Sequence, residues 1–396
     1  MRPAILGRLR LLAACVAAIA ACLCPLASSA IDPYVINVIL PQTGAGAFVA
    51  KVEVNALTVA QQVINKAGGV RGRPIAFAVL DDQSDPSVAV QLYNKLIAGG
   101  ATFFLGSSLS ATCNATGALL KEGPLQWCFS PGVRPPAGSY LYSAGVDSAA
   151  LLGAGLRYLR ERGLTRVGVL TSTDATGQDG DRSIDALFAA PENKSLTIVD
   201  REHFNPADVN VAAQMARFKA AGANVIIGWA TGAPFGTILR GVRDEGLDIP
   251  VMSTPGNALA VQLRQYLSIM PTELLFPNLR SFLLPDQTPR GPAHDALVRF
   301  YAAFKTAGLQ PSGEGQVWDP IFIVTSALQK LGVDPGAAQL RDYVNNLQGW
   351  TGINGEYNFH TYPQRGIGID SVVVVRWDPA KEVGIPLSQP GGALLK

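Results

Sequence analysis

The sequence predicts an α/β protein with two lobes, each built on a parallel β-sheet that helices cover on both faces. Short apolar runs alternate along the chain with segments whose apolar residues recur every three or four positions, as is typical of such sheets. This alternation starts afresh after about residue 146, which predicts a second sheet. A chain of 396 residues, 48% hydrophobic and 16% charged, supplies enough apolar material for both cores.

The first lobe opens with the apolar run Val35–Leu40, a predicted strand that ends in the turn at 41–44. From Ala56 the apolar residues fall on one face of a helix, which the glycine pair at 68–69 ends. The remaining elements predicted in this lobe are strands at 75–80, 102–105 and 126–129 and helices at 87–98 and 111–122.

The second lobe repeats the pattern. Its predicted elements are helix 148–162, strand 166–170, helix 181–190, strand 196–199, helix 209–221, strand 225–227, helix 234–245 and strand 251–252. Residues 276–292 are rich in proline and polar residues, which predicts a crossover. Helices at 293–307 and 320–331 and a strand at 371–377 follow. Asp319 and Pro320 suit the N-cap and the first position of the second of these helices.

The first thirty residues predict an export signal. Three arginines precede an apolar run at 11–26, which is short for a membrane span and typical of a signal peptide. Small residues at 28–30 predict cleavage after Ala30. A second interpretation stays open, because the residues before Cys22 fit a lipoprotein cleavage box that would leave a lipid-anchored Cys22 as the first residue. Either cleavage gives an exported protein.

The exported chain carries almost no net charge. The first thirty residues hold three of the 32 basic residues and no acidic one, which leaves 29 basic and 30 acidic residues. This balance argues against nucleic acid as a partner. Cys113 and Cys128 remain as an even pair in an oxidising compartment, which predicts a disulfide. Two cysteines and three scattered histidines supply no metal site.

No catalytic motif accompanies the predicted fold. His203, His294 and His360 have no serine or cysteine motif nearby, and the sequence contains no phosphate-binding or dinucleotide-binding glycine motif. Asp81 and Asp82 end a strand before a Ser-Asp-Pro stretch, so turn chemistry explains them. We therefore expect neither an enzyme nor a cofactor.

The stretch GSSLSATCNATG at 106–117 follows an apolar strand and leads into a predicted helix. Small hydroxyl residues there favour an anion, because the free N–H groups and the dipole of a helix N-terminus point toward it. In open parallel sheets, ligands bind at the carboxyl ends of the strands. The loops at those ends, which we expect to line a cleft, are 41–49, 106–110, 130–135, 171–178, 229–234 and 253–257.

A series of blocks resembles, in order, the periplasmic solute-binding proteins of ABC importers, in the branched-chain-amino-acid class. The blocks are INKAGGVRGRPIAFAVLDDQSDPSVAVQLYNKLI at 64–97, FLGSSLS at 104–110, SPG at 130–132, ATGQDG at 175–180, FKAAGANVIIG at 218–228 and ILRGVRDEGLDIPV at 238–251. The resemblance implies a type I clamshell with three crossovers, near residues 146, 280 and 360. It implies an N-lobe of 31–146 plus 281–358 and a C-lobe of 147–280 plus 359–396.

The resemblance also implies that Ser110 binds a ligand carboxylate, with Ser108 as a weaker candidate. From the residues alone, Ser110 could instead only cap its helix. The backbone of the loop at 130–134 would grip the same carboxylate, and Gly132 would allow its close approach. Arg134 stands where many relatives have a small hydroxyl residue. It would either form a bidentate pair with the carboxylate or remain a solvated surface arginine.

The second lobe departs from the amino-acid binders of this family, which hold the ligand's ammonium group with an acidic residue. The matching loop at 253–257 has no carboxylate, and Asn257 is its nearest polar group. Thr176 replaces a usual tyrosine, and Thr231 replaces a bulkier residue. Because a buried ammonium without an anionic partner is costly, an amine-free carboxylate such as an aromatic acid is favoured.

We therefore expect a periplasmic binding protein that delivers a small amine-free carboxylate to an ABC permease in the inner membrane. Phe48 and Trp229 would form walls for such a ligand or serve only the core and the hinge. Two alternatives stay open. One is a sensor module of the same fold that reports to a receptor, and the other is an amino-acid-binding protein.

Overall fold

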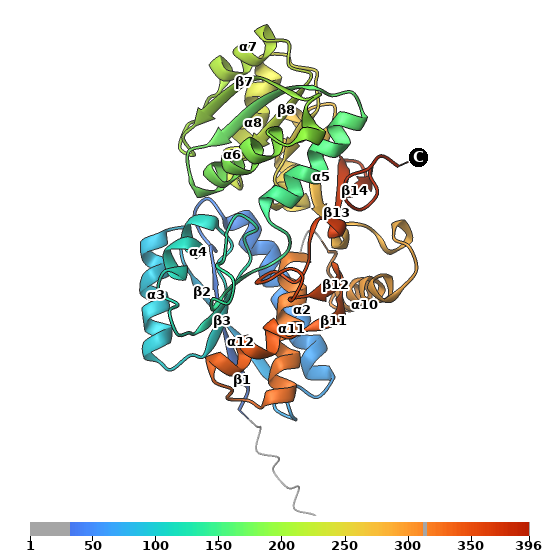
Figure 1. Ribbon diagram of the computed structural model, residues 1–396. Coiled ribbons are helices and arrows are strands. Elements are labelled where there is room, and N and C mark those ends of the chain that lie inside the picture. The colour runs from blue at the N-terminus through green and yellow to red at the C-terminus, as the bar shows by residue number, and fades with distance from the viewer. Residues whose placement is uncertain (1–31, 312–314, 396) are drawn as a thin grey trace, which may run out of the picture. The chain divides into compact units, whose positions relative to one another are not determined.

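The computed structural model describes residues 32–311 and 315–395. From Tyr34 onward the chain forms one unit, and the residues up to Pro33 belong to a separate one. The predicted signal peptide and the predicted lipidation site at Cys22 lie outside the described residues. The larger unit contains two large sheets, which helices cover, and one two-stranded sheet. This α/β architecture confirms the predicted fold class (Figure 1).

The first sheet holds five parallel strands in the order β2-β1-β3-β4-β5. They are β1 (Tyr34–Leu40), β2 (Ile75–Asp81), β3 (Phe103–Gly106), β4 (Leu125–Cys128) and β5 (Leu141–Ser143). The sequence does not predict β5, because three residues are too few to show a period. Since β3 and β4 are parallel neighbours, the loops that follow them meet at one edge of the sheet.

Helices pack around this sheet. They are α2 (Ala47–Lys66), α3 (Pro86–Ala98), α4 (Ser110–Gly117), α10 (Pro292–Thr306), α11 (Gly315–Leu331) and α12 (Ala337–Asn345). The last three come from the late part of the chain, and two of them, α10 and α11, pack against α2. Two predicted bounds are wrong. α2 begins at Ala47 rather than 56, because its apolar face continues through Ala50 and Val52. α4 ends at Gly117 rather than 122, where the chain turns.

The second sheet has seven strands in the order β14-β13-β10-β9-β8-β6-β7. They are β6 (Arg166–Ser172), β7 (Thr197–Phe204), β8 (Val225–Trp229), β9 (Val251–Ser253), β10 (Leu274–Leu279), β13 (Val372–Asp378) and β14 (Val383–Pro386). β13 is antiparallel to both of its neighbours, and the other pairings are parallel. The prediction that 276–292 is entirely a crossover is wrong at its start. Burial of every residue in β10 outweighs the missing N–H of Pro277.

Helices also cover the second sheet. They are α5 (Ser148–Glu161), α6 (Ala175–Phe188), α7 (Ala212–Ala220), α8 (Ala233–Asp244) and α9 (Ala260–Leu263). Short 3₁₀ helices are η1 (Pro191–Asn193), η2 (Pro255–Asn257), η3 (Arg264–Ile269), η4 (Arg280–Phe282), η5 (Pro285–Gln287) and η6 (Ile369–Ser371). The predicted start of α6 at 181 is wrong, because the Asp174 carboxylate caps the helix six residues earlier by accepting from the N–H groups of Thr176 and Gly177.

Asp319 is not an N-cap, so that prediction is also wrong. α11 already includes Gly315, and both Asp319 and Pro320 lie inside it. The buried Asp319 carboxylate instead accepts hydrogen bonds from the backbone N–H groups of Ile353 and Asn354, at 2.9 and 3.0 Å. These two residues form the turn of a hairpin made by β11 (Gln348–Gly352) and β12 (Gly355–Asn358).

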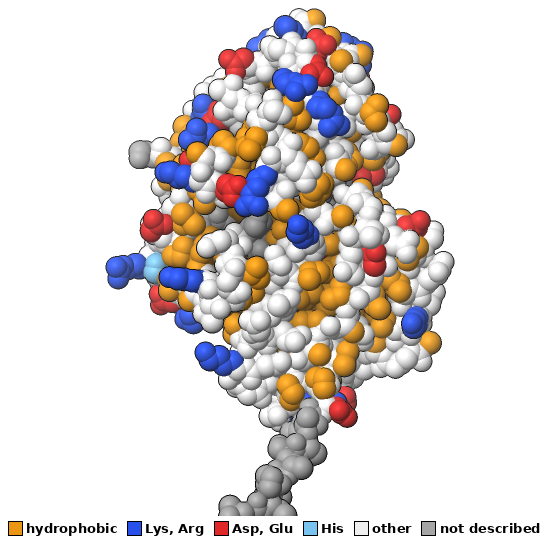
Figure 2. All heavy atoms as spheres, turned by 180° about the vertical axis from the view of Figure 1, so that it is seen from behind, with side chains coloured by type: hydrophobic (Ala, Val, Ile, Leu, Met, Phe, Trp, Pro, Cys, Tyr) orange, Lys and Arg blue, Asp and Glu red, His pale blue; other side chains and the backbone are white. Residues whose placement is uncertain are grey.

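The order of the elements carries the chain between the two sheets repeatedly. It leaves the first sheet after β5, leaves the second after β10, and returns to the second at β13. The exact lobe bounds, 31–146 plus 281–358 and 147–280 plus 359–396, stay a prediction. Among the described residues, no helix is long and apolar enough to span a membrane. Charged side chains of both signs are interspersed over the face in Figure 2, in keeping with the small net charge.

Candidate functional site

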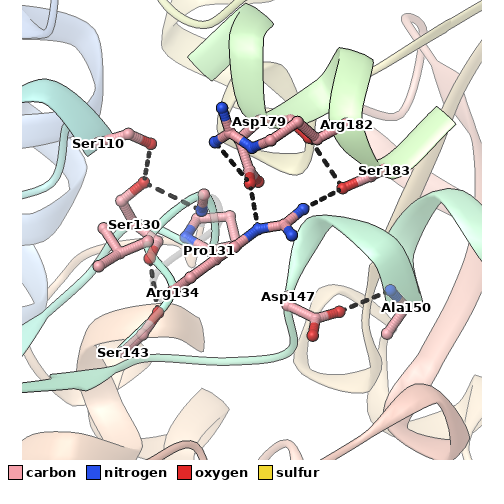
Figure 3. Close-up of polar contacts among 12 residues, drawn as sticks. Ser110, Ser130, Pro131, Arg134, Ser143, Asp147, Ala150, Asp179, Arg182 and Ser183 are labelled. Atoms are coloured by element: carbon pink, nitrogen blue, oxygen red, sulfur yellow. Dashed lines mark hydrogen bonds and ion pairs between the residues drawn. The ribbon is translucent and has the colours of Figure 1, made fainter. Parts of the chain in front are cut away.

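Two loops at the carboxyl ends of β3 and β4 form a polar cradle (Figure 3). Ser110 is the first residue of α4 and is buried. Its hydroxyl lies 2.8 Å from the hydroxyl of Ser130, which in turn accepts a hydrogen bond from the N–H of Gly132 at 3.3 Å. The N-cap of α4 is Leu109, so Ser110 does not cap its own helix. Ser130, which was not among the predicted site residues, lies in the same SPG block as Gly132.

Gly132 allows the second loop to approach Ser110. A Cβ atom at this position would lie 2.4 Å from Ser110 Oγ and 3.6 Å from Asp179 Oδ2. Any side chain at 132 would therefore displace the Ser110 hydroxyl. The close approach of a ligand carboxylate to Gly132 stays a prediction, and the atoms that come close to it in this structure belong to the protein.

Arg134 reaches from the same loop to α6 of the second sheet. Its Nε donates to Asp179 Oδ1 at 2.7 Å, and its Nη2 donates to Ser183 Oγ at 3.1 Å. Asp179 is buried and also pairs with Arg182 at 3.3 Å. Arg134 is therefore neither a free surface arginine nor a free anion receptor in this structure. The sequence contained Asp179 in the block ATGQDG, but gave no sign that it would face residue 134.

The neighbouring serines are tied to buried carboxyl groups. Ser107 donates to Asp82, and Ser108 donates to Glu53 Oε2 at 2.6 Å. Burial raises the pKa of Glu53 to about 8 and also raises the pKa of Asp82. Asp82 thus does more than the predicted turn chemistry. Ser108, predicted as a weaker ligand contact, is already hydrogen-bonded within the protein.

Asp81 behaves as its turn position predicts. Its carboxylate accepts hydrogen bonds from the N–H of Gln83 and from the N–H and hydroxyl of Thr43. These bonds lower the pKa of Asp81 below its ordinary value. The residue therefore fastens the loop after β1 to the end of β2.

The predicted residues of the second sheet lie mostly inside its own loops. The buried Asn257 side chain accepts from Gly232 N at 2.9 Å and donates to Ala230 O at 2.6 Å. The Thr231 hydroxyl lies 2.9 Å from the hydroxyl of Thr254. Asn257 therefore shapes the loop at 230–232.

Three further residues predicted to contact the ligand lie at different places in the structure. Trp229 is almost fully buried and packs so closely on Gly180 that a Cβ there would lie 2.3 Å from its Cδ1. Phe48 is only partly buried, near the start of α2. Thr176 lies in the first turn of α6, and Asp174 Oδ1 accepts from its N–H at 3.1 Å.

Loops of the two sheets also touch away from Arg134. Gly232 has a φ of +82°, and a Cβ there would lie 2.3 Å from the carbonyl oxygen of Ala45. Nearby, a cavity of about 30 Å³ is lined by Glu53 of α2, Gly256 of the second sheet's loops and Val317 of α11, among others. The predicted loops at 41–49, 229–234 and 253–257 thus face one another.

Two sheets, one parallel and one mainly parallel, with loops that face each other around buried polar groups, form a two-lobed α/β protein. Residues 33–382 match the family model of the periplasmic binding proteins. The chain therefore belongs to the periplasmic binding protein family, which confirms the resemblance found in the sequence.

Individual relatives differ in the ligands that their names give. The chain is 24% identical over 378 residues to a Leu/Ile/Val-binding protein homolog of Brucella melitensis, a match that covers 91% of this chain and 95% of the relative. It shares its fold with a solute-binding protein of an ABC transporter from R. palustris in complex with benzoate, with a TM-score of 0.73, 15% identity and coverage of 92% and 98%. It also shares its fold with the branched-chain amino acid transporter substrate binding protein LivJ of Streptococcus pneumoniae in complex with isoleucine, with a TM-score of 0.73, 16% identity and coverage of 90% and 100%.

Proposed function

We propose that this protein binds a small carboxylate between its two lobes outside the cytoplasm and delivers it to an ABC permease. Membership of the periplasmic binding protein family supports the transport role and the location. The ligand would favour the closed arrangement, because only there does it touch both lobes. The permease would then recognise the closed protein.

The observation that carries this proposal is the cradle of Ser110, Ser130 and Gly132. Two hydroxyl groups and a backbone N–H converge beside the N-terminus of α4. Hydrogen-bond donors at a helix N-terminus are a favourable site for an anion. A carboxylate would take the place of the Ser110–Ser130 contact and accept from both hydroxyls and from Gly132.

An amine-free carboxylate is the ligand that we favour. A ligand ammonium needs a buried anionic partner, and the loop at 253–257 offers only Asn257, whose amide is hydrogen-bonded within the protein. The carboxylate of Asp179, which lies beside Gly132, already pairs with two arginines. The benzoate complex of a protein with the same fold gives a suitable probe.

An α-amino acid is the second candidate, and Asp179 favours it. Its Oδ2 lies near Gly132, so an ammonium group beside the cradle would find a buried anion. In that case Arg134 would leave Asp179 and bind the ligand's carboxylate. The Brucella melitensis relative, named as a Leu/Ile/Val-binding homolog, supports testing leucine alongside benzoate.

Cys113 of α4 and Cys128 of β4 lie side by side, with their Cα atoms 6.0 Å apart. We propose that they form the disulfide predicted from the sequence once the protein is exported. This bond would tie the helix that carries Ser110 to the strand that precedes Ser130. It would thereby hold the cradle's two loops together.

A thermal-shift screen of the exported protein tests this proposal, with benzoate, other aromatic acids, aliphatic carboxylates and leucine as probes. A ligand present at 100 times its Kd stabilises the folded state by about 2.7 kcal/mol. We expect a shift with an amine-free carboxylate that is lost in Ser110→Ala. Ser326→Ala, which removes a helix hydroxyl bonded to Phe322 O, serves as the control. A shift with leucine alone would support the second candidate, and no shift with any carboxylate would contradict both.

A further inference from the structure

Arg365 lies beneath the cradle although it comes from the other end of the chain, between β12 and β13. It is buried, with 9% of the residue exposed. Its Nη2 donates to the carbonyl oxygens of Pro131, at 3.2 Å, and of Val133. Its Nη1 donates to Ser143 Oγ at 2.9 Å and to Gly145 O at 3.4 Å. One guanidinium thus holds the carbonyl groups on both sides of Gly132.

Among residues 32–311 and 315–395, no acidic side chain forms an ion pair with Arg365. Within the part of the chain that the structure describes, its hydrogen-bond partners are carbonyl and hydroxyl oxygens. Burial lowers the pKa of Arg365 to about 10, and the more distant Asp147 and Asp179 favour its charged form while Arg134 opposes it. The group is therefore cationic at neutral pH. Because a charge is poorly screened in a buried environment, its field extends to the loop above it.

The segment that carries Arg365 is itself fixed to the first sheet. The neighbouring Gln364 accepts from Gly138 N through its Oε1 and donates to Ser139 O, both at 3.0 Å. The N–H of Ser143 in β5 donates to the carbonyl of Gln364. These bonds leave the guanidinium little freedom, so the position of the 131–133 carbonyls follows from that of Arg365.

We infer that Arg365 is the positioning residue of the anion site: it fixes the loop at 131–133 so that the Gly132 N–H stays in the cradle, and its charge selects a carboxylate over a neutral ligand of the same shape. This inference rests on the proposed function. A planar guanidinium suits the task because it can serve four acceptors at once in fixed directions. Lysine would keep the charge but not this geometry.

The positioning role is tested first without any ligand. Hydrogen–deuterium exchange of a peptide covering 129–135 is compared in wild type, Arg365→Gln and Arg365→Lys. We expect exchange on the order of tenfold faster in Arg365→Gln, since a loss of about 1.4 kcal/mol of protection corresponds to that factor. Arg166→Gln is the matched control, because Arg166 also holds two carbonyl groups, those of Ala221 and Gly222, far along the chain from the cradle. If the 129–135 peptide of Arg365→Gln exchanged at the same rate as in wild type, the inference would be overturned.

The charge selection is tested with benzoate and its neutral amide, benzamide, by calorimetric titration. We expect Arg365→Gln to lose on the order of tenfold or more in benzoate affinity, as one lost charge interaction implies. Benzamide should lose clearly less, because it shares the loosened loop but carries no charge. Arg365→Lys should keep part of the preference. Equal losses for both ligands would overturn the selection. If wild type binds leucine instead, leucine and leucinamide replace the pair.

The two proposals fail in different ways. A wild-type protein that binds neither benzoate nor leucine contradicts the proposed function, and the selection of a carboxylate falls with it. The inference about Arg365 alone is contradicted if the wild-type protein binds a carboxylate but Arg365→Gln changes neither of two properties. These are the preference for the carboxylate over its amide and the hydrogen–deuterium exchange of 129–135.

Discussion

Gly132 is the residue at which one added carbon would disturb the cradle most directly. In Gly132→Ala the new Cβ would meet Ser110 Oγ, which can rotate away at small cost to stability but only by leaving Ser130. We expect the free energy of unfolding to fall by about 1 kcal/mol or less and the affinity for a carboxylate to fall on the order of tenfold. Denaturation and calorimetry measure the two effects. A variant that binds as tightly as wild type would place the ligand elsewhere.

Glu53 couples the stability of the protein to pH. Its pKa is raised by burial from an ordinary 4.5 to about 8, so between these values the folded state keeps a proton that the unfolded state releases. The free energy of unfolding therefore decreases as pH rises through this window, and the contribution of the protonated group is lost above about pH 8.

Glu53→Gln should remove this dependence, because glutamine does not ionise and can still accept from Ser108. We expect the variant to gain stability relative to wild type between pH 5 and 8, by about 1.4 kcal/mol per pH unit at most. Urea denaturation of both proteins at several pH values measures the difference. If the free energy of unfolding of the two proteins changed with pH in the same way, Glu53 would not be a buried, protonated acid.

At the level of single residues, the sequence could predict the cradle residues that directly follow strands. It could not predict the residues that distant segments of the chain contribute. Ser110 and Gly132 stand at strand ends within short motifs, and the structure brings them together. Asp179 lies 45 residues away from its partner Arg134, and Arg365 lies at least 220 residues away from its partners at 131–145. Such contacts depend on how the two sheets and the late segments pack, which local periodicity does not encode.

Among the elements, the β11–β12 hairpin depends on one buried carboxylate of α11. Asp319 accepts from the N–H groups of Ile353 and Asn354, from the Asn354 amide and from the Tyr357 hydroxyl. A Cβ at Gly352 would lie 2.3 Å from the same carboxylate, so the hairpin turn wraps closely around it. These hydrogen bonds fasten the hairpin to the helix, and Ile353 and Tyr357 are also buried in the apolar core.

Asp319→Asn should unfold at a lower denaturant concentration. The amide side chain has one acceptor oxygen in place of two, and its NH₂ group would face the donors that now bind the carboxylate. We expect a loss of about 2–4 kcal/mol in the free energy of unfolding, as for a broken buried network. Asp342→Asn on α12 serves as the control, since this residue is exposed and its carboxylate pairs with the neighbouring Arg341. Equal stability in the two variants would contradict the role given to Asp319.

Elements with a clear apolar period could be predicted from sequence, and those held by tertiary contacts could not. The strands β1 and β2 and the helices α3 and α5 lie within one or two residues of their predicted bounds. β10 was mistaken for a crossover because of Pro277, and the hairpin has no apolar alternation that would reveal it. Burial against the rest of the protein, rather than local propensity, forms these elements.

At the scale of the whole molecule, the Arg134–Asp179 pair connects a loop of the first sheet to a helix of the second. Asp179 would keep its partner Arg182 if Arg134 were removed, so the buried charge would not be left unpaired. Loss of Arg134 would therefore weaken the contact between the lobes more than the lobes themselves. A ligand carboxylate would be able to replace Asp179 as the partner of Arg134 when it binds.

Arg134→Gln should shift the ligand-free protein toward more open forms. We expect a larger radius of gyration by small-angle X-ray scattering, with a change of at most about 1 kcal/mol in the free energy of unfolding because Arg134 is half exposed. Arg217→Gln, which breaks an ion pair with Glu202 inside one lobe, is the control. An unchanged radius would show that Arg134 does not hold the lobes together.

The most direct test of the central claim is a crystal structure of the exported protein with the carboxylate that stabilises it most in the screen. We predict that the ligand's carboxylate oxygens lie within hydrogen-bond distance of Ser110 Oγ and Gly132 N, with loops of both sheets around the rest of the ligand. A carboxylate bound away from these two residues, with the Ser110–Ser130 contact intact, would contradict it.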